Sequence, residues 1–411
     1  MKGRRSLLLA AFACGALTCA ERRAPDPSAL PPAVTAVPPG LRSPRSVIID
    51  TARRTTSPDL ARRNLDAAIE GAWSHYERIG SSGTRTRLVS LLQLRARMTG
   101  SYDDFLAIDE LTRDTAGSPQ ALIERAGYLT TVHQFVEARE LLDAAERAGA
   151  TEAMLLADRL TIELAVGADP AALIPLAQAR ADARDDTNSW TLLAGVLAAS
   201  GDFEGADRAF RTALDRYGDV SPFTFATNAF RRGVMWAEMA DRPDLARPLY
   251  EEAVRRFPDY VVANVHLAEL EALAGEVERA ITRLRRLVDS GVGDPEPAGY
   301  LGELLGGEGA AFVTEARERY EVLLRRHRGA FADHGSEFFA GPGGDPARAL
   351  ELAAFNLEAR RDGRAYVVAL GAAEAAGDHA QRCAWALEAE PLGERHPVLA
   401  SEVRRALERC D

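Results

Sequence analysis

Residues 189–213 read SWTLLAGVLAASGDFEGADRAFRTA, and this stretch decides the fold class. Trp190, Leu193 and Leu197 are three and four residues apart, a spacing that predicts a helix with one buried face. Gly201-Asp202 interrupts the pattern, because glycine favours a helix end and aspartate favours the start of the next helix. Apolar and small residues resume at helical intervals directly after this break. The stretch therefore predicts two helices joined as a hairpin.

The same pattern recurs along most of the chain. Alanines in the second helix of each unit follow one another at intervals of 34, 34, 40, 34, 36, 33 and 31 residues, and they are Ala138, Ala172, Ala206, Ala246, Ala280, Ala316, Ala349 and Ala380. A small side chain at this point lets two helices cross closely, and side chains four and seven residues later share its face. The sequence therefore predicts a series of helical hairpins, with no convincing strand pattern.

The unit at 190–213 resembles a tetratricopeptide repeat (TPR). The residues that carry the resemblance are Trp190, Leu193, Ala194, Leu197, Gly201, Phe203, Ala206, Phe210 and Ala213. The resemblance extends over residues 121–387 and weakens after Gly291. It implies an all-α fold, a right-handed superhelical solenoid of TPR-type helix-turn-helix repeats.

Changes in composition divide the chain into five parts. We expect an export signal or lipobox at residues 1–19, a Pro-rich disordered tether at 20–57, N-terminal helices forming a degenerate repeat at 58–116, the TPR solenoid at 117–390 and a C-terminal capping helix at 391–411. Seven prolines between residues 24 and 45 favour an extended spacer over a packed domain.

The first twenty residues have the organisation of an export signal. Basic residues are followed by an uncharged, mostly apolar run at residues 7–17, which is too short to be a comfortable membrane span. The residues before Cys19 resemble a bacterial lipobox, which implies that Cys19 is lipidated; Cys14 is a weaker candidate acceptor. Ordinary cleavage before Glu21 is the alternative. We expect an exported protein on the periplasmic side of the cell envelope, lipid-anchored or else soluble or secreted.

The charge of the chain argues against nucleic-acid binding. Fifty basic and 61 acidic residues give a formal net charge of −11, and the isoelectric point is near 5.3. Phosphate-backbone recognition requires a basic face, so we expect no nucleic acid among the partners. Lys2 is the only lysine, which excludes Schiff-base, P-loop and kinase-type lysine chemistry from the rest of the chain.

Sequence motifs for metal or haem binding do not occur: there is no HExxH, CxxC or CxxCH. We therefore expect no cofactor, no metal site and no catalytic residue. The alternative is an enzyme, or a substrate-recruiting subunit of one, whose site lies in the poorly matched stretch 291–345. Such a site would need perturbed titratable groups among Glu308, Glu315, Asp333, His334 and Glu337.

Cys383 and Cys410 are the two cysteines outside the expected signal. In an oxidising compartment they could form a disulfide that staples the end of the solenoid, worth about 3 kcal/mol in the chain-entropy account. The alternative is a buried, unbonded Cys383 and a free Cys410.

The resemblance implies that a partner binds the concave wall formed by the first helix of each hairpin. Eight groove residues follow from it: Asn188, Thr191, Gly195, Asn228, Arg231, Met235, Glu238 and Glu269. We expect a non-catalytic scaffold or adaptor that holds a protein or an extended peptide there, and that meets the membrane only through an N-terminal lipid. The Lys/Asn/Arg carboxylate clamp of some family members is missing. A cytoplasmic regulatory binding module is a further alternative.

Overall fold

The computed structural model describes residues 46–115 and 118–410, and within these ranges every regular element is a helix. The first part comprises α2 (Pro58–Ile79), α3 (Ser82–Thr99), α4 (Asp104–Arg113), α5 (Pro119–Thr131), α6 (Phe135–Arg147), α7 (Glu152–Ala165), α8 (Pro170–Arg184), α9 (Thr187–Ala199), α10 (Phe203–Asp215), α11 (Pro222–Val234), the π-helix η1 (Met235–Met239) and α12 (Pro243–Arg256). The second part comprises α13 (Val261–Leu273), α14 (Val277–Asp289), α15 (Glu296–Leu305), the 3-10 helix η2 (Gly306–Gly309), α16 (Ala310–Arg326), α17 (Arg328–Ala340), α18 (Pro346–Ala359), α19 (Gly363–Ala376), α20 (His379–Gly393) and α21 (Pro397–Leu407). The predicted all-α solenoid is confirmed.

The α9–α10 hairpin forms for the reasons that its sequence indicated. Gly201 adopts a φ of +88°, a left-handed conformation that glycine takes without strain. The Asp202 side chain then accepts a hydrogen bond from the Gly205 backbone N–H and caps α10. Ala206 is fully buried where the helices cross, and Phe210 is 4% exposed one turn later. Burying a phenylalanine is worth about 2 kcal/mol.

Six of the eight alanines used to define the repeat are fully buried, but two were placed on the wrong face. In α8 the buried side chains are Leu173, Ala177 and Ala181, whereas Ala172 is exposed. In α20, Ala380 is exposed, and Trp385 and Ala386 point inward instead. Both helices contain many alanines, so an alanine at the expected interval does not fix which face is buried.

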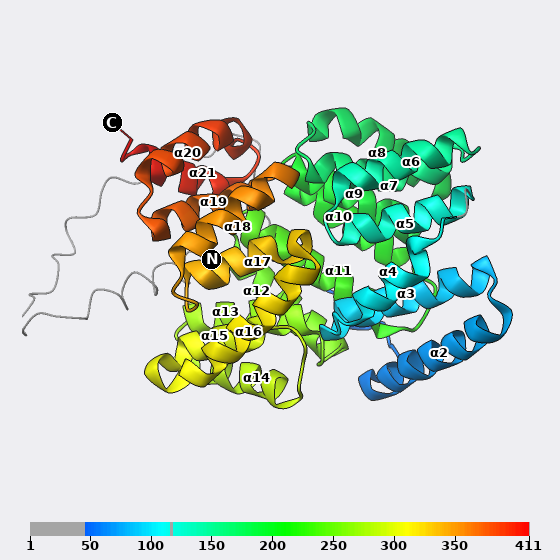
Figure 1. Cartoon of the computed structure of the whole chain (residues 1–411), viewed down its shortest axis with the longest axis horizontal. Coiled ribbons are helices and arrows are strands. Elements are labelled where there is room, and N and C mark those ends of the chain that lie inside the picture. Colours follow the sequence, from blue (N-terminus) through cyan, green and yellow to red (C-terminus); the bar gives the residue numbers. More distant parts are fainter. Residues whose placement is uncertain (1–45, 116–117, 411) are drawn as a thin grey trace, which may run out of the picture.

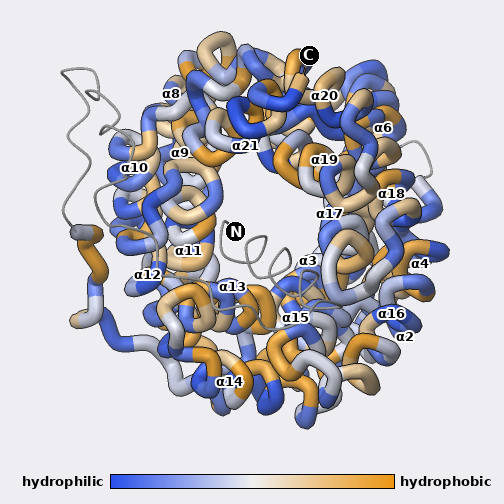
Figure 2. The backbone as a smooth tube through the Cα atoms, turned by 90° about the vertical axis from the view of Figure 1, so that its left-hand side faces the viewer, coloured by the Kyte–Doolittle hydropathy of each residue, from blue (hydrophilic) through white to orange (hydrophobic). Residues whose placement is uncertain are grey.

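The hairpins wind into a right-handed superhelix. Figure 2 looks along its axis and shows α9, α11, α13, α15, α17 and α19 on the inner side of a ring, with α10, α12, α14 and α16 outside them. The inner helices are the first helices of successive hairpins, as the repeat pattern predicts. They form the wall that encloses the superhelix axis.

Successive turns of the superhelix are in direct contact. The Tyr102 hydroxyl donates to Asp294, 192 residues further along the chain, and the His133 ring lies 3.0 Å from the carbonyl oxygen of Gly329, 196 residues away. The Arg361 backbone N–H donates to the Ala165 carbonyl, and Arg395 forms an ion pair with Asp169. In Figure 1 the two turns lie beside each other, with α5–α10 on the right and α13–α21 on the left. Loops of the second turn therefore stack on loops of the first.

Residues 46–57 differ from the expected disordered tether. This segment, called the strap below, lies in extended form against α10, α11 and α12, with Val47 and Ile49 packed on their apolar core. Arg232 donates to the Ile48 carbonyl, and Arg256 donates to the carbonyls of Asp50 and Arg53. The docking of the strap is not evident from the sequence, because its partner residues lie about two hundred positions away.

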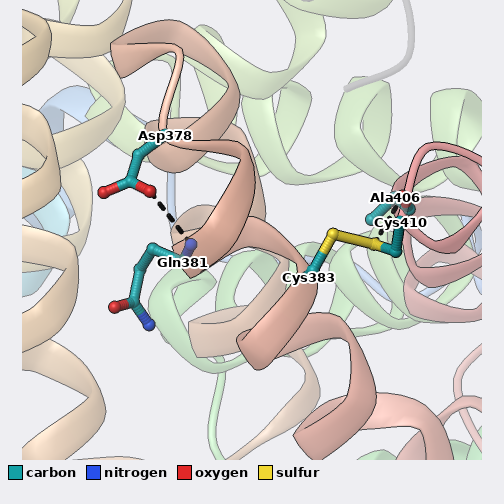
Figure 3. Close-up of a disulfide and its surroundings, with 5 residues drawn as sticks. All are labelled: Asp378, Gln381, Cys383, Ala406 and Cys410. Atoms are coloured by element: carbon teal, nitrogen blue, oxygen red, sulfur yellow. Dashed lines mark hydrogen bonds between the residues drawn. A yellow bond between two sulfur atoms is a disulfide. The ribbon is translucent and has the colours of Figure 1, made fainter.

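The end of the chain is closed by a disulfide. Cys383 in α20 is bonded to Cys410, and their Cα atoms are 5.8 Å apart (Figure 3). The bond fastens the end of α21 onto α20. Cys14, Cys19 and the expected signal lie outside the described residues. Among the helices that are described, none has the length and apolarity needed to cross a bilayer.

Candidate binding cavity on the inner wall

A cavity of about 470 Å³ opens on the inner wall where the two turns meet. Its first-turn side comes from α7, α9, α11 and η1, and its second-turn side comes from the start of α19 and the loop before α21. Apolar lining residues are Leu164, Leu192, Val234, Met239, Val367 and Leu392. The cavity has the volume of a typical small-ligand or peptide-side-chain pocket.

A π-helix shapes one edge of this cavity. The backbone widens from α-helix to π-helix over Met235–Met239 and turns Met235 and Trp236 into the core while Glu238 faces the inner wall. A π-helical turn is rare and frequently marks a functional position. Glu238 accepts a hydrogen bond from Arg364 of α19 at 3.0 Å, so this edge also joins the two turns.

Arg364 is the centre of a buried charge network. It donates to Glu238 and to Glu337, and its Nε lies 3.6 Å from Asp333. Burial would raise the pKa of Asp333, but the charges on His334, Arg364 and Arg360 outweigh it and hold that pKa well below its usual range. Asp333 is therefore ionised, and the network fixes α17 against α19.

Two histidines extend this network along the inner wall. His266 Nδ1 lies 3.2 Å from carboxylate oxygens of both Glu238 and Glu269. Burial would lower the pKa of His266, but these two carboxylates raise it above 6.5. Burial likewise opposes protonation of His334, yet Asp333 and Glu296 raise its pKa to about 10. His334 is thus a cation at neutral pH.

Arg231 differs from the other cations of the cavity. The arginines at 360, 361, 364 and 395 each form ion pairs with carboxylates. No hydrogen bond or ion pair within residues 46–115 and 118–410 involves the Arg231 guanidinium. Its side chain is exposed to solvent, but it lies inside the solenoid, where the surrounding protein and the nearby Arg97 lower its pKa.

Gly195 leaves open space in the cavity. It lies in the middle of α9, and a Cβ atom built there would meet no heavy atom within 4 Å. A larger side chain at this position would therefore project into the cavity without displacing a neighbour.

The eight predicted groove residues fall into different environments. Thr191, Gly195, Arg231 and Glu238 line the cavity together. Asn188 is exposed on α9 outside it. Asn228 and Met235 are buried; Asn228 donates to the Phe210 carbonyl, and Met235 packs in the core. Glu269 is buried beside His266.

Four of the five titratable candidates in 291–345 take part in ion pairs. Asp333, His334 and Glu337 belong to the network around Arg364, and Glu315 pairs with Arg319. None of them lines the cavity, and Glu308 is exposed on η2. Structural ion pairs account for the perturbed pKa values of Asp333 and His334. In the described part of the chain, no group of three or more His, Cys, Asp or Glu side chains could hold a metal ion.

The residues on the second-turn side of the cavity were not predicted from the sequence. Residues 360–364 read RRDGR, a mostly cationic run that leads into the first turn of α19, and its three arginines line the cavity. The charge run was the only signal available. Nothing in the sequence indicates that this loop stacks on α7, α9 and η1.

Residues 238–304, from η1 into α15, match the model of a family described as tetratricopeptide repeat. This segment is therefore similar to the tetratricopeptide repeat family. The remaining hairpins have the TPR-type helical arrangement, and repeats of this type are typical of protein–protein interaction scaffolds.

No curated protein sequence matches the chain. Solved structures with similarity include the APC/C hetero-tetramer Cut9–Hcn1, with 13% identity, 82% of this chain and 68% of that chain covered and a TM-score of 0.42. Yeast Tom70 has 12% identity, coverages of 86% and 95% and a TM-score of 0.33. A tetratricopeptide repeat protein from Parabacteroides merdae ATCC 43184 has 16% identity, coverages of 70% and 98% and a TM-score of 0.34.

Proposed function

We propose that this protein is a non-catalytic binding scaffold that holds a segment of a partner protein in the cavity at Gly195. The observation that carries the proposal is the cavity itself, which two superhelical turns build on the inner wall of a TPR-type solenoid. Apolar residues on its walls offer contact area, and Arg231 and Thr191 offer polar groups that could orient a peptide.

The export signal and Cys19 support a place for this scaffold at the bacterial cell envelope. In this proposal a lipid on Cys19 tethers the solenoid, and the Pro-rich stretch separates it from the membrane. The mass of the mature N-terminus from membrane and soluble fractions tests this part. A diacylated chain beginning at Cys19 supports the tether, whereas an intact Met1 overturns the envelope assignment.

Photo-crosslinking in the native host tests the cavity. A photoreactive amino acid replaces Thr191, and the partner adducts are compared in three backgrounds: no further change, Gly195→Trp and Gly71→Trp. Gly71 lies in the middle of α2 and is exposed, and a Cβ at Gly71, like one at Gly195, would meet no heavy atom within 4 Å. Both substitutions remove a helix glycine and should not destabilise their helices.

We expect a discrete adduct that Gly195→Trp reduces at least tenfold and that Gly71→Trp leaves unchanged. Circular dichroism and size-exclusion chromatography check that both variants are folded. An adduct that survives Gly195→Trp, or the absence of any adduct in the folded protein, would overturn the proposal.

A further inference from the structure

Helix α11 lies between the strap and the inner cavity. Two neighbouring residues in its last turn serve the two sides: Arg231 lines the cavity, and Arg232 donates to the Ile48 carbonyl of the strap at 2.8 Å. The strap runs on the outer side of the ring, beside α10 and α12 (Figure 2). A change in how the strap is held therefore acts on the same helix that forms one wall of the cavity.

One carboxylate connects the strap contact to the π-helix η1. Asp207 of α10 accepts a hydrogen bond from Arg232 Nε at 2.9 Å and one from Trp236 Nε1 at 3.4 Å. Arg232 and Trp236 are both buried. A buried guanidinium is stable only when its donors are paired, and the partners of Arg232 are Asp207 and the strap carbonyl at Ile48. Removing the strap leaves a buried donor unpaired at the group that also holds Trp236.

The π-helix η1 is an element with two accessible backbone forms. The Ala240 N–H donates to the Met235 carbonyl, five residues back, where an α-helix would use the carbonyl four residues back. A return to α-helical spacing would turn the residues beyond it by about 100° around the helix axis, because 3.6 residues make one turn. Glu238 would then leave the edge of the cavity, where it accepts a hydrogen bond from Arg364.

We propose that the strap regulates the cavity: docked on Arg232, it holds η1 in the π-helical form that places Glu238 at the cavity edge, and its release lets η1 relax. By linkage, a partner segment that requires this form of the cavity must in turn favour the docked strap. The effect on the partner rests on the proposed function, whereas the effect on η1 does not. The strap directly follows the Pro-rich stretch in the sequence, so a pull on that stretch reaches the strap before any helix.

Two neighbouring positions of the strap provide a matched pair of variants in the full chain. Ile49 packs on the apolar core, whereas Ile48 is 63% exposed. Ile49→Asp should therefore release the strap, and Ile48→Asp should leave it docked. Arg256→Gln, which removes the donors that α12 offers to the strap, is a second strap-releasing variant. The rate of trypsin cleavage after Arg53 or Arg54 reports the release, and circular dichroism checks that each variant is folded.

Hydrogen exchange at the amides of residues 235–240 measures the state of η1 without any partner. We expect Ile49→Asp and Arg256→Gln to accelerate this exchange at least fivefold, the lower end of ordinary coupling between sites. Ile48→Asp should exchange as the wild type does. The amides of α14, which do not contact the strap, are the internal reference and should be unchanged in all variants.

Trp236→Phe tests the route through Asp207. It removes the indole N–H that Asp207 accepts and leaves the contact between Arg232 and the strap in place. In this background, adding Ile49→Asp should change exchange at η1 less than twofold, because the link between the strap and η1 is already cut.

Unchanged exchange at η1 in the strap-released variants would overturn the proposal. So would an acceleration that persists in full with Trp236→Phe, because it would indicate general loosening of α11. The photo-crosslink at Thr191 gives the second reading, and strap release should reduce its adduct at least fivefold. An adduct that survives strap release in full means that the strap does not regulate the partner. If the wild type forms no adduct, the scaffold function fails, and exchange at η1 still decides whether the strap controls η1.

Discussion

At the scale of single residues, buried arginines hold backbone rather than only side chains. Arg256 is 3% exposed; it pairs with Glu252 through Nε and uses both terminal nitrogens for carbonyl oxygens of the strap. Its guanidinium and that of Arg53 lie over the ring of Phe225, at 4.7 and 5.1 Å from the centroid. One side chain thus fixes a segment more than two hundred residues away.

Replacing Arg256 by Gln should release the strap. The variant loses charge-assisted hydrogen bonds to Asp50 and Arg53 in a buried position, which costs about 2 kcal/mol of unfolding free energy. Trypsin should then cut after Arg53 or Arg54 at least tenfold faster than in the wild type. Arg255→Gln is the matched control, because Arg255 also pairs with Glu252 but is half-exposed and does not contact the strap. Equal cleavage of the two variants would contradict the role of Arg256.

The charge on His334 should make the unfolding free energy of the chain decrease as the pH rises from 6.5 to 10. Its pKa is about 10 in the folded chain and about 6.5 in the unfolded chain, because folding places it beside Asp333 and Glu296. A raised folded pKa stabilises the fold fully below pH 6.5, and this contribution is lost as the pH rises to 10. A third of the side chain is exposed, so solvent screens part of the effect.

Urea unfolding at pH 6.5 and pH 10 measures this contribution. Between these two pH values, the unfolding free energy of the wild type should fall by at least about 1 kcal/mol more than that of His334→Gln, since one pKa unit corresponds to about 1.4 kcal/mol. His379→Gln, at an exposed position, should behave as the wild type. Equal losses in the wild type and His334→Gln would show that the imidazolium contributes nothing.

At the scale of elements, the sequence predicts the α9–α10 hairpin well, but it does not predict which face of α8 is buried or that η1 is a π-helix. The α9–α10 unit follows from Leu193, Gly201 and Ala206, which set the apolar face, the turn and the crossing point by local rules. The buried face of α8 could not be predicted in the same way, because alanines lie on several sides of that helix. The π-helical turn at η1 (Met235–Met239) gave no signal in the sequence.

The last element, α21, depends on a covalent bond. Cys383 and Cys410 are 27 residues apart, and closing a loop of this size stabilises a fold by about 3.5 kcal/mol in the chain-entropy account. The Cys383→Ser/Cys410→Ser double variant should therefore melt at a lower temperature than the oxidised wild type. A reductant should lower the melting temperature of the wild type and leave that of the double variant unchanged. A wild type that is insensitive to reductant would contradict this role.

At the scale of the whole molecule, glycines with the same local role have different long-range roles. Gly80 and Gly100 both end a helix with a φ near +65°, and the sequence gives no reason to distinguish them. A Cβ at Gly80 would meet nothing, whereas a Cβ at Gly100 would lie 2.8 Å from Asp294 Cβ in the next turn. The solenoid was therefore predictable, but the stacking of its turns was not, because its contacts join residues almost two hundred positions apart.

Comparing substitutions at Gly80 and Gly100 measures how much the contact between the turns contributes to stability. Gly80→Ala and Gly100→Ala share the backbone strain of about 1 kcal/mol that a positive φ imposes on alanine. Gly100→Ala should cost about 1 to 3 kcal/mol more, because it also overpacks the interface at Asp294. Urea unfolding of both variants gives the difference, and small-angle scattering shows whether the turns separate. Equal destabilisation of the two variants would indicate that the turns are not tightly packed against each other at Gly100.

The stacked turns change how such a chain should lose its structure. An open repeat array behaves as a one-dimensional system in which terminal units fray while central ones stay folded. Here the loop after α5 contacts the start of α17 through His133 and Gly329, and the end of α7 contacts the loop before α19 through Ala165 and Arg361, so these units have neighbours in two dimensions. Hydrogen exchange should then report one cooperative opening across both turns, and the many contacts of long sequence separation should make folding slow for an all-helical protein.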